Sequence, residues 1–282
     1  MNLSARSAAA GKSAGLWLQS CAVLAIAAGM LLAFGGAAAR LVLRLLREPQ
    51  AGDVALGVGA YLLLAGAAGA ALRRAYRRLS PRGYAAAVVA AYFLAQLALI
   101  AAGGARLRWT GDAGLLHQYV QTLATHGYGP EILAPLSEAY DYQVWSRRAL
   151  PFYVLLHRIA GPAFPAAVQT FNAGLMALTA LLTWRLGRLL FGPRAAAAAL
   201  ALHVLLPWRL FTHLDLSHHV LGGFYYGLGV WILVEWHQPR RGVWPRAGLA
   251  LAALLLLPLM RLEGGIDFVY AAAVAGTLAL AW

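Results

Sequence analysis

Long apolar runs without a charged residue constrain this chain more than any other feature of its sequence. About 20 consecutive apolar residues are needed to cross the roughly 30 Å hydrocarbon core of a bilayer. Five runs meet that requirement: 13–39, 54–72, 83–105, 159–184 and 216–234. Three shorter runs, 195–208, 247–260 and 268–282, reach it if a flanking arginine extends to the membrane surface.

Backbone polar groups inside lipid must be hydrogen-bonded within the chain, so these runs are predicted to be helices. We therefore expect an all-α fold, a polytopic transmembrane bundle of about eight helices. The composition agrees, since 61% of the residues are hydrophobic and 12% are charged, against about 25% charged in soluble domains. The single cysteine, Cys21, excludes an internal disulfide, a CxxC redox pair and a thiolate zinc site.

The net charge of +13 would suggest nucleic-acid binding in a soluble domain. Here the arginines instead form short clusters between apolar runs, as in 73–82, which is typical of cytoplasmic loops, so we expect no nucleic-acid partner. With a cytoplasmic N-terminus, segments 1–15, 73–83, 185–194 and 235–246 lie inside and hold more than half of the basic residues and one acid, Glu235. The sequence thus predicts a multi-pass protein of the cell membrane, an inner or plasma membrane, in contact with membrane lipid.

The first run has an alternative interpretation as a signal peptide. Arg6 and Lys12 precede it, and the small residues 37–39 could form a cleavage site. The run is long for a signal peptide, which favours an uncleaved helix.

One long connection, about 104–158, is predicted to lie outside the membrane, and connections of this length usually carry function. Residues 115–124 have the apolar spacing of a helix, 127–130 are predicted to form a turn, and 149–159 are apolar, with Pro151 near the start. We expect this extracytoplasmic loop to carry one or two short interfacial helices.

Polar residues in this loop could carry chemistry. Asp112 could deprotonate a hydroxyl or bind a divalent cation, although the start of a helix is a simpler reason for an aspartate there. Arg147 and Arg148, preceded by Tyr142 and Gln143, suit a lipid-linked phosphate, which the guanidinium group can bind with two hydrogen bonds. The alternative is an ordinary interfacial belt of aromatic and basic anchors.

Two further polar groups are predicted on the same side of the membrane. Asp215, His218 and His219 share one helical face and could bind zinc or manganese, or could simply cap a helix at the interface. Arg261 and Glu263 follow the seventh run, where they could line a polar cavity or pair with each other.

Taken in order, these groups resemble the N-terminal membrane half of the GT-C glycosyltransferases, which include protein O-mannosyltransferases and GPI mannosyltransferases. The resemblance covers about 85–282. Its most specific pieces are residues 125–128 (THGY), 140–143 (YDYQ), 147–151 (RRALP) and 186–192 (LGRLLFG). Residues 1–80 do not match and are predicted to form a two-helix N-terminal membrane anchor, with 81–282 as the transmembrane core.

The resemblance implies an inverting enzyme that transfers a hexosyl or pentosyl group from a polyprenyl-phosphate-linked donor. The acceptor would be extracytoplasmic: a cell-envelope glycan, a lipid or a protein. It implies catalytic roles for Asp112 and Asp215, and donor-phosphate binding by Arg147, Arg148 and Arg261. Lining of the substrate cavity is assigned to Tyr128, Tyr142, Gln143, His218 and Glu263. No particular cofactor is predicted, and a divalent cation remains open.

Two other hypotheses follow from the sequence. The family usually has a second acid where Ala113 stands, and it has more helices, so the chain could be an inactive fragment or subunit that needs a C-terminal half or a partner. A transporter or lipid-carrier flippase would instead need polar residues near helix centres, for which the candidates are Gln96, Gln169, Asn172 and His203.

Overall fold

The computed structural model describes residues 51–103, 112–129, 131, 146–206, 209, 214, 218–236, 238 and 243–256. All of the regular secondary structure in these ranges is helical, which confirms the all-α class. The helices expected at 13–39 and 268–282 lie outside the described residues. The division between residues 80 and 81 stays a prediction.

Each apolar run that falls in the described ranges forms a helix. In chain order these are α2 (Ala51–Arg78), α3 (Pro81–Gly103), α7 (Phe164–Phe191), α8 (Pro193–Leu205), α10 (His218–Trp236) and α11 (Val243–Leu256). The connection between α3 and α7 carries α4 (Asp112–His126), α6 (Ser146–Ala160) and a 3-10 turn, η2 (Gly161–Ala163). The two helices expected in the long loop are therefore present.

The helix ends differ from the apolar runs in two ways. The run 159–184 is divided, because α6 ends at Ala160 and α7 begins at Phe164 after the 3-10 turn, and other helices continue past their runs where arginines occur. α2 continues six residues past its run, to Arg78, and α7 continues seven residues past its run, to Phe191. Arginine favours helix and can extend its side chain toward water, so a basic cluster does not end a helix. The breaks come instead at Ser80, whose Oγ accepts a hydrogen bond from the Gly83 N–H at 3.1 Å, and at Gly192, where φ is +88°.

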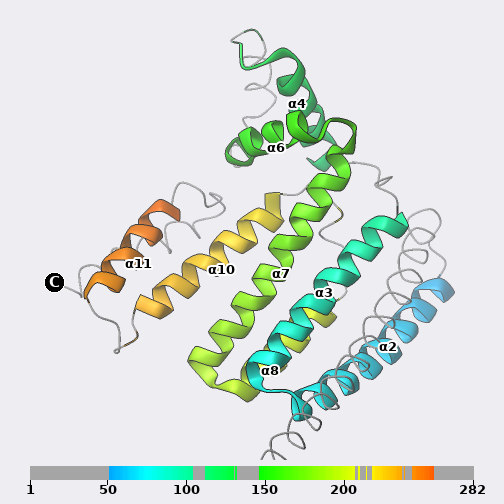
Figure 1. The fold of residues 1–282 in the computed structure, drawn as a ribbon. Helices are drawn as coiled ribbons and strands as arrows, with labels where there is room; N and C mark the ends of the chain where they lie inside the picture. The colour runs from blue at the N-terminus through cyan, green and yellow to red at the C-terminus, as the bar shows by residue number, and fades with distance from the viewer. Residues whose placement is uncertain are drawn as a thin grey trace, which may run out of the picture.

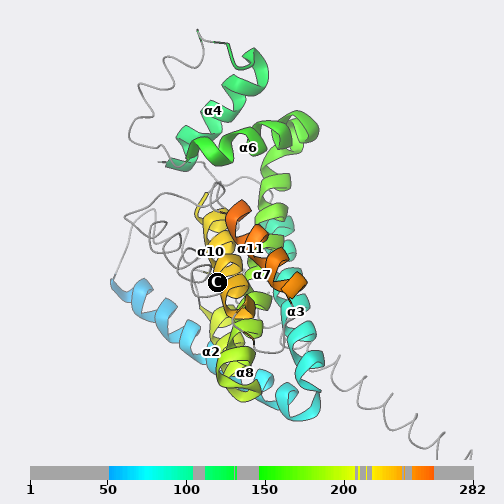
Figure 2. The same ribbon diagram turned by 90° about the vertical axis from the view of Figure 1, so that its left-hand side faces the viewer.

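Six helices form a bundle, and α4 and α6 lie across one end of it (Figure 1). In the bundle α7 contacts α3, α8 and α10, while α2 packs on α3 and α8, and α11 packs on α10. Figure 2 shows the same two levels from the side, with α4 and α6 crossing beyond the end of α7. We call this end of the molecule the α4/α6 end.

The opposite end carries a concentration of arginines, and we call it the arginine end. The turns between α2 and α3 and between α7 and α8 both lie there (Figure 1). The arginines come from α2, α3, α7 and α8: Arg73, Arg74, Arg77, Arg78, Arg82, Arg185, Arg188 and Arg194.

The one described acid at this end is paired. The Glu235 carboxylate on α10 is 3% exposed and accepts a hydrogen bond from Arg185 Nη2 on α7 at 3.0 Å. Arg188, one turn further along α7, has its guanidinium 5.5 Å from the centre of the Trp184 ring. These contacts join α7 to α10 and hold two arginines close to the helix surface.

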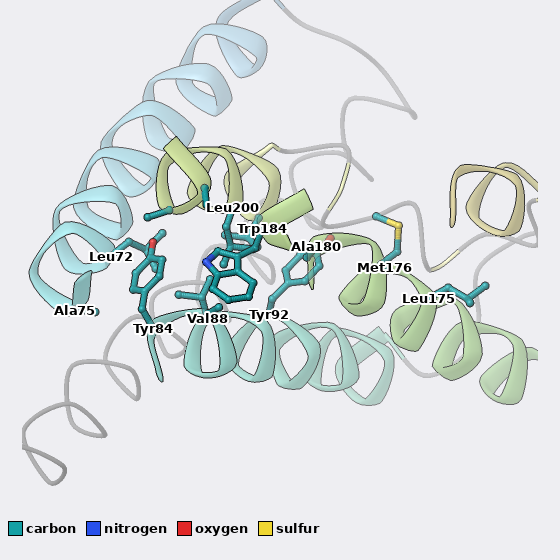
Figure 3. Close-up of a cluster of buried hydrophobic side chains, with 14 of the residues drawn as sticks. Leu72, Ala75, Tyr84, Val88, Tyr92, Leu175, Met176, Ala180, Trp184 and Leu200 are labelled. Atoms are coloured by element: carbon teal, nitrogen blue, oxygen red, sulfur yellow. The ribbon is translucent and has the colours of Figure 1, made fainter. Parts of the chain in front are cut away.

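A large apolar core joins α2, α3, α7 and α8, as Figure 3 shows. The cluster contains Tyr84, Val88 and Tyr92 of α3, Met176, Ala180 and Trp184 of α7, Leu72 of α2 and Leu200 of α8.

Small residues allow the helices to approach closely. A Cβ atom on Gly187 of α7 would lie 2.9 Å from Ala196 Cα of α8, so the two backbones meet there because the glycine has no side chain.

Two helical segments are long and apolar enough to cross a membrane, Pro81–Ala102 and Leu150–Phe191. Their most apolar stretches are only 39% and 44% buried within the chain, whereas a core helix of a soluble protein would be mostly covered. Large apolar side chains also face outward on every helix of the bundle: Val58, Leu62, Leu63, Leu94, Leu178, Leu181, Leu190, Phe191, Leu202, Val230, Trp244, Leu251, Leu254 and Leu255. Together these features favour association with a membrane.

The close approach at Gly187 predicts a strong effect of a single methyl group. We expect Gly187→Ala to lower the free energy of unfolding by about 1–3 kcal/mol, because the added Cβ must displace the backbone of α8. Thermal unfolding of the protein in detergent would measure the change.

The matched control is Gly174→Ala, in the same helix, where an added Cβ has no atom within 4 Å. This substitution should be neutral or stabilising, by up to about 1 kcal/mol, because alanine favours helix. Equal effects of the two substitutions would contradict the close contact between α7 and α8.

Candidate functional site

The α4/α6 end is held together by an apolar interface between two crossing helices. Leu116, Val120 and Leu123 form one face of α4 and are at most 2% exposed. They pack against Leu150, Tyr153 and Val154 of α6, and Phe164 and Val168 of α7 complete the cluster. The spacings in α4 and α6 are helical, so one buried stripe of each helix joins it to the other and to α7.

Three aromatic rings lie where α4, α6 and α7 meet. The His117 ring stacks on Phe164 with 5.8 Å between centres, and the His157 ring lies 4.8 Å from the same phenylalanine. Burial lowers the pKa of His117 below its ordinary value, and the neighbouring His157 lowers it further. The native packing therefore favours an uncharged His117.

Asp112 is the first residue of α4. It lies four residues before Leu116, which places position 112 one turn ahead of the buried stripe on the same side of the helix. An acidic residue at this position is stabilised by the positive end of the helix dipole, which agrees with the simpler interpretation of Asp112. The position also puts it at the edge of the α4–α6 interface.

Arg147 and Arg148 are the second and third residues of α6, whose first turn contains no acid. Position 147 precedes Leu150 by three residues and so lies on the face that packs against α4. Two cations at the positive end of a helix repel the helix dipole and each other, so they do not stabilise α6. The arrangement is one that an anion would neutralise, and backbone N–H groups of the first turn, which have no partner within the helix, could join in binding it.

The other predicted site residues are described only in part. Tyr128 follows Gly127, where φ is +81°, and its side chain is 45% exposed just beyond the end of α4. His218 is the first residue of α10, and its side chain lies outside the described residues. Tyr142, Gln143, Asp215, Arg261 and Glu263 lie outside them as well.

Of the predicted metal site, Asp215 lies outside the described residues, and His218 and His219 are described only as backbone positions at the start of α10. Within the ranges that the structure describes, no three His, Cys, Asp or Glu side chains come close enough together to hold a metal ion.

Buried polar side chains form a second feature, which lies beneath the α4/α6 end. α8 has 13 residues and is therefore about 20 Å long. It ends at Leu205, three residues before the end of its apolar run, because residue 206 is extended and Pro207 follows. A buried carbonyl group at the end of a helix or after it that lacks a helical partner needs a hydrogen bond from elsewhere in the protein.

Side chains from α2, α3 and α7 supply these hydrogen bonds. The Tyr61 hydroxyl donates to the Leu205 carbonyl oxygen at 2.5 Å, and the Tyr92 hydroxyl to that of Arg209 at 2.8 Å. Gln169 Nε2 donates to the Leu214 carbonyl oxygen at 3.0 Å. Gln96 Nε2 is 3.4 Å from the Arg209 carbonyl oxygen, so it shares that acceptor with Tyr92.

These bonds give a structural role to residues that the sequence analysis interpreted differently. Gln96 and Gln169 were candidates for a transport pathway, and both bind backbone after α8. His203 is likewise within hydrogen-bond distance of a neighbour, with Nδ1 3.3 Å from Thr183 Oγ1. Tyr61 and Tyr92 were not predicted, and the signal that could have identified them is a phenol in an otherwise aliphatic run, since a buried hydroxyl needs a partner.

Comparisons with known proteins return nothing for this chain: no family model, curated protein or solved structure matches it.

The bond from Gln169 leads to a prediction about stability. Gln169→Leu keeps the size of the side chain but leaves the Leu214 carbonyl without its donor, so we expect a loss of about 1–3 kcal/mol in the free energy of unfolding. Thr170→Leu, at the exposed neighbouring position, is the control and should change it by less than about 0.5 kcal/mol. Indistinguishable thermal unfolding of the two variants would contradict this role of Gln169.

The environment of His117 predicts that low pH loosens the α4/α6 end. A histidine whose pKa is lowered by folding stabilises the native state above the ordinary histidine value, about 6.5, and that stabilisation is lost as the pH falls below it. Hydrogen exchange of α4 should therefore become faster between about pH 7 and pH 5. His117→Phe should remove most of this pH dependence, whereas His126→Phe, at an exposed position of the same helix, should retain it.

Proposed function

We propose that the chain is a multi-pass membrane glycosyltransferase of the GT-C kind, with its reaction site at the α4/α6 end. The donor would be a sugar linked to a polyprenyl phosphate, and the acceptor an extracytoplasmic glycan, lipid or protein of the cell envelope. The observation that carries the proposal is the first turn of α6, where Arg147 and Arg148 stand at the positive end of a helix that has no acid there. A lipid-linked phosphate would neutralise the positive charge of this pair.

The position of the two helices supports this assignment. α4 and α6 lie across one end of an apolar bundle, the level at which the head group of a membrane lipid would stand (Figure 2). Asp112 begins one of them and the arginine pair begins the other, and the buried faces that carry positions 112 and 147 pack together. A carboxylate and a phosphate-binding pair are the two groups that this transfer needs.

The distribution of charge supports the orientation. The arginine end contains arginines from four helices, and its described acid, Glu235, is neutralised by Arg185. Because cytoplasmic ends of membrane helices carry the excess of Lys and Arg, this end would face the cytoplasm of a cell with an inner or plasma membrane. The α4/α6 end would then be outside, and the N-terminus inside.

The proposed reaction is a direct displacement at the anomeric carbon of the donor. The Asp112 carboxylate accepts the proton of an acceptor hydroxyl, whose oxygen forms the new bond to the anomeric carbon. The bond from that carbon to the phosphate oxygen breaks, and the electron pair leaves with the lipid phosphate. Arg147 and Arg148 stabilise the negative charge that develops on the phosphate, and the configuration at carbon inverts.

The buried polar residues favour an enzyme over a transporter or flippase. A transport pathway needs polar groups that are available to a substrate. Instead, one polar atom each of Gln96, Gln169 and His203 has a partner in backbone or in a neighbouring threonine. The other polar atoms of these side chains, and Oδ1 of Asn172, are buried away from solvent.

A kinetic test distinguishes the role of Asp112 as the base from the role of Arg148 in binding the donor phosphate. In the full chain, reconstituted with a polyprenyl-phosphate sugar, Asp112→Asn should lower kcat about 100- to 10,000-fold because the base is lost. Arg148→Ala should raise the KM for the donor about 10- to 100-fold, as expected for the loss of a charged hydrogen bond. The measurement is the initial rate of sugar transfer at varied donor concentration.

Two exposed residues provide matched controls. Glu131→Gln removes an acid of the same connection, and Arg194→Ala removes an arginine at the opposite end. Both should leave kcat and KM within about twofold of wild type, a difference of about 0.4 kcal/mol. Transfer by Asp112→Asn at the wild-type rate would refute the assigned base, and an unchanged KM in Arg148→Ala would remove that residue from the phosphate site.

A further inference from the structure

A groove runs between α3 and α7 at the arginine end and is not explained by the proposed transferase site. It has a volume of about 510 Å³. Its walls are mainly apolar and its mouth is basic, with the lining formed by Arg82, Ala85, Ala86, Val89, Ala90, Phe93, Ala177, Leu181, Trp184, Arg185 and Arg188. Figure 1 shows α3 and α7 side by side along this stretch.

The length of the groove corresponds to one leaflet of a bilayer. Its lining on α3 begins at Arg82 and ends at Phe93, and its lining on α7 begins at Arg188 and ends at Ala177. Eleven residues of helix rise about 16 Å, and half of a hydrocarbon core is about 15 Å thick. An acyl chain with its carboxyl end at the arginines would therefore end near the middle of the membrane.

The charge at the mouth is positive. Arg185 is neutralised by Glu235, which leaves Arg82 and Arg188 as the cations of the mouth, and no carboxylate is found among its described lining residues. Arg82 is exposed in the first turn of α3. Arg188 is positioned by the Trp184 ring beneath it, so little freedom is lost when its guanidinium binds a phosphate.

We propose that this groove binds one anionic phospholipid from the leaflet at the arginine end. One acyl chain lies along the apolar walls between α3 and α7, and the phosphate is bound by Arg82 and Arg188. This site is separate from the proposed donor site, which is at the opposite end of α7, and it does not depend on the glycosyltransferase proposal. It requires only that the bundle be in a membrane.

The test measures binding of a fluorescent short-chain phosphatidylglycerol to the full-length protein in neutral detergent micelles. Unlabelled phosphatidylglycerol should compete at least tenfold better than phosphatidylcholine, which has the same apolar chains without net charge. An arginine near a membrane surface contributes about fivefold to the binding of an anionic lipid. Arg82→Gln with Arg188→Gln should therefore weaken binding about 25-fold.

Matched controls distinguish a specific lipid-binding site in the groove from general attraction of an anionic lipid to the positive charge of the arginine end. Arg194→Gln removes an exposed arginine of the same end that does not line the groove, and it should change the affinity less than twofold. Ala90→Trp fills the groove from an exposed position on α3 and should abolish most binding, whereas Ala198→Trp, at an exposed position on α8, should not. Thermal unfolding of each variant verifies that it is folded.

Three results would overturn the proposal. If Arg194→Gln weakens binding as much as the double substitution, the lipid senses only the overall charge of this end. If folded Ala90→Trp binds like wild type, the acyl chain does not occupy the groove. If polyprenyl phosphate binds and phosphatidylglycerol does not compete with it, the groove belongs to a carrier lipid.

Discussion

The packing of α7 against its neighbours holds the described part of the chain together. This helix contacts α3, α8 and α10 in the bundle, and α6 packs on its first turns. In its contact with α8, Gly187 lets the two backbones meet. That approach sets the position of α8, and the end of α8 in turn sets where the following carbonyl groups need donors. In that arrangement Tyr92 and Gln169 donate hydrogen bonds to the carbonyl oxygens of Arg209 and Leu214.

The two ends of the bundle differ in chemistry as well as in structure. At the arginine end, basic side chains stand on helix ends that are closed by short turns. At the α4/α6 end, two additional helices pack through their own apolar cluster. A bundle that only anchored a protein would not need this second layer, and the layer is where the arginine pair of α6 stands. This difference between the two ends is the reason for placing the proposed reaction at the α4/α6 end.

The sequence predicted the existence of the helices well, since uncharged apolar runs have few alternatives in lipid. It also predicted one or two helices in the connection before α7, and α4 was indicated by its helical spacing. It misplaced helix ends at basic clusters, because charge patterning does not show where an arginine-bearing turn ends. The roles of Gln96 and Gln169 could not be predicted, because their acceptors are 113 and 45 residues away in the chain. Asp112, Arg147 and Arg148 were predicted from residue type, and the structure places them in the first turns of α4 and α6.

The length of α7 has a consequence for which changes the protein can tolerate. The helix has 28 residues, about 42 Å, and joins both ends without interruption. Inserting a single residue near its middle would rotate Phe164 and the attached layer by about 100° relative to the arginines and shift them by about 1.5 Å. No neighbour could accommodate that rotation without losing its contacts. Insertions and deletions should therefore be tolerated only in the connections between helices. In α7, the number of residues should be as restricted as the residue types.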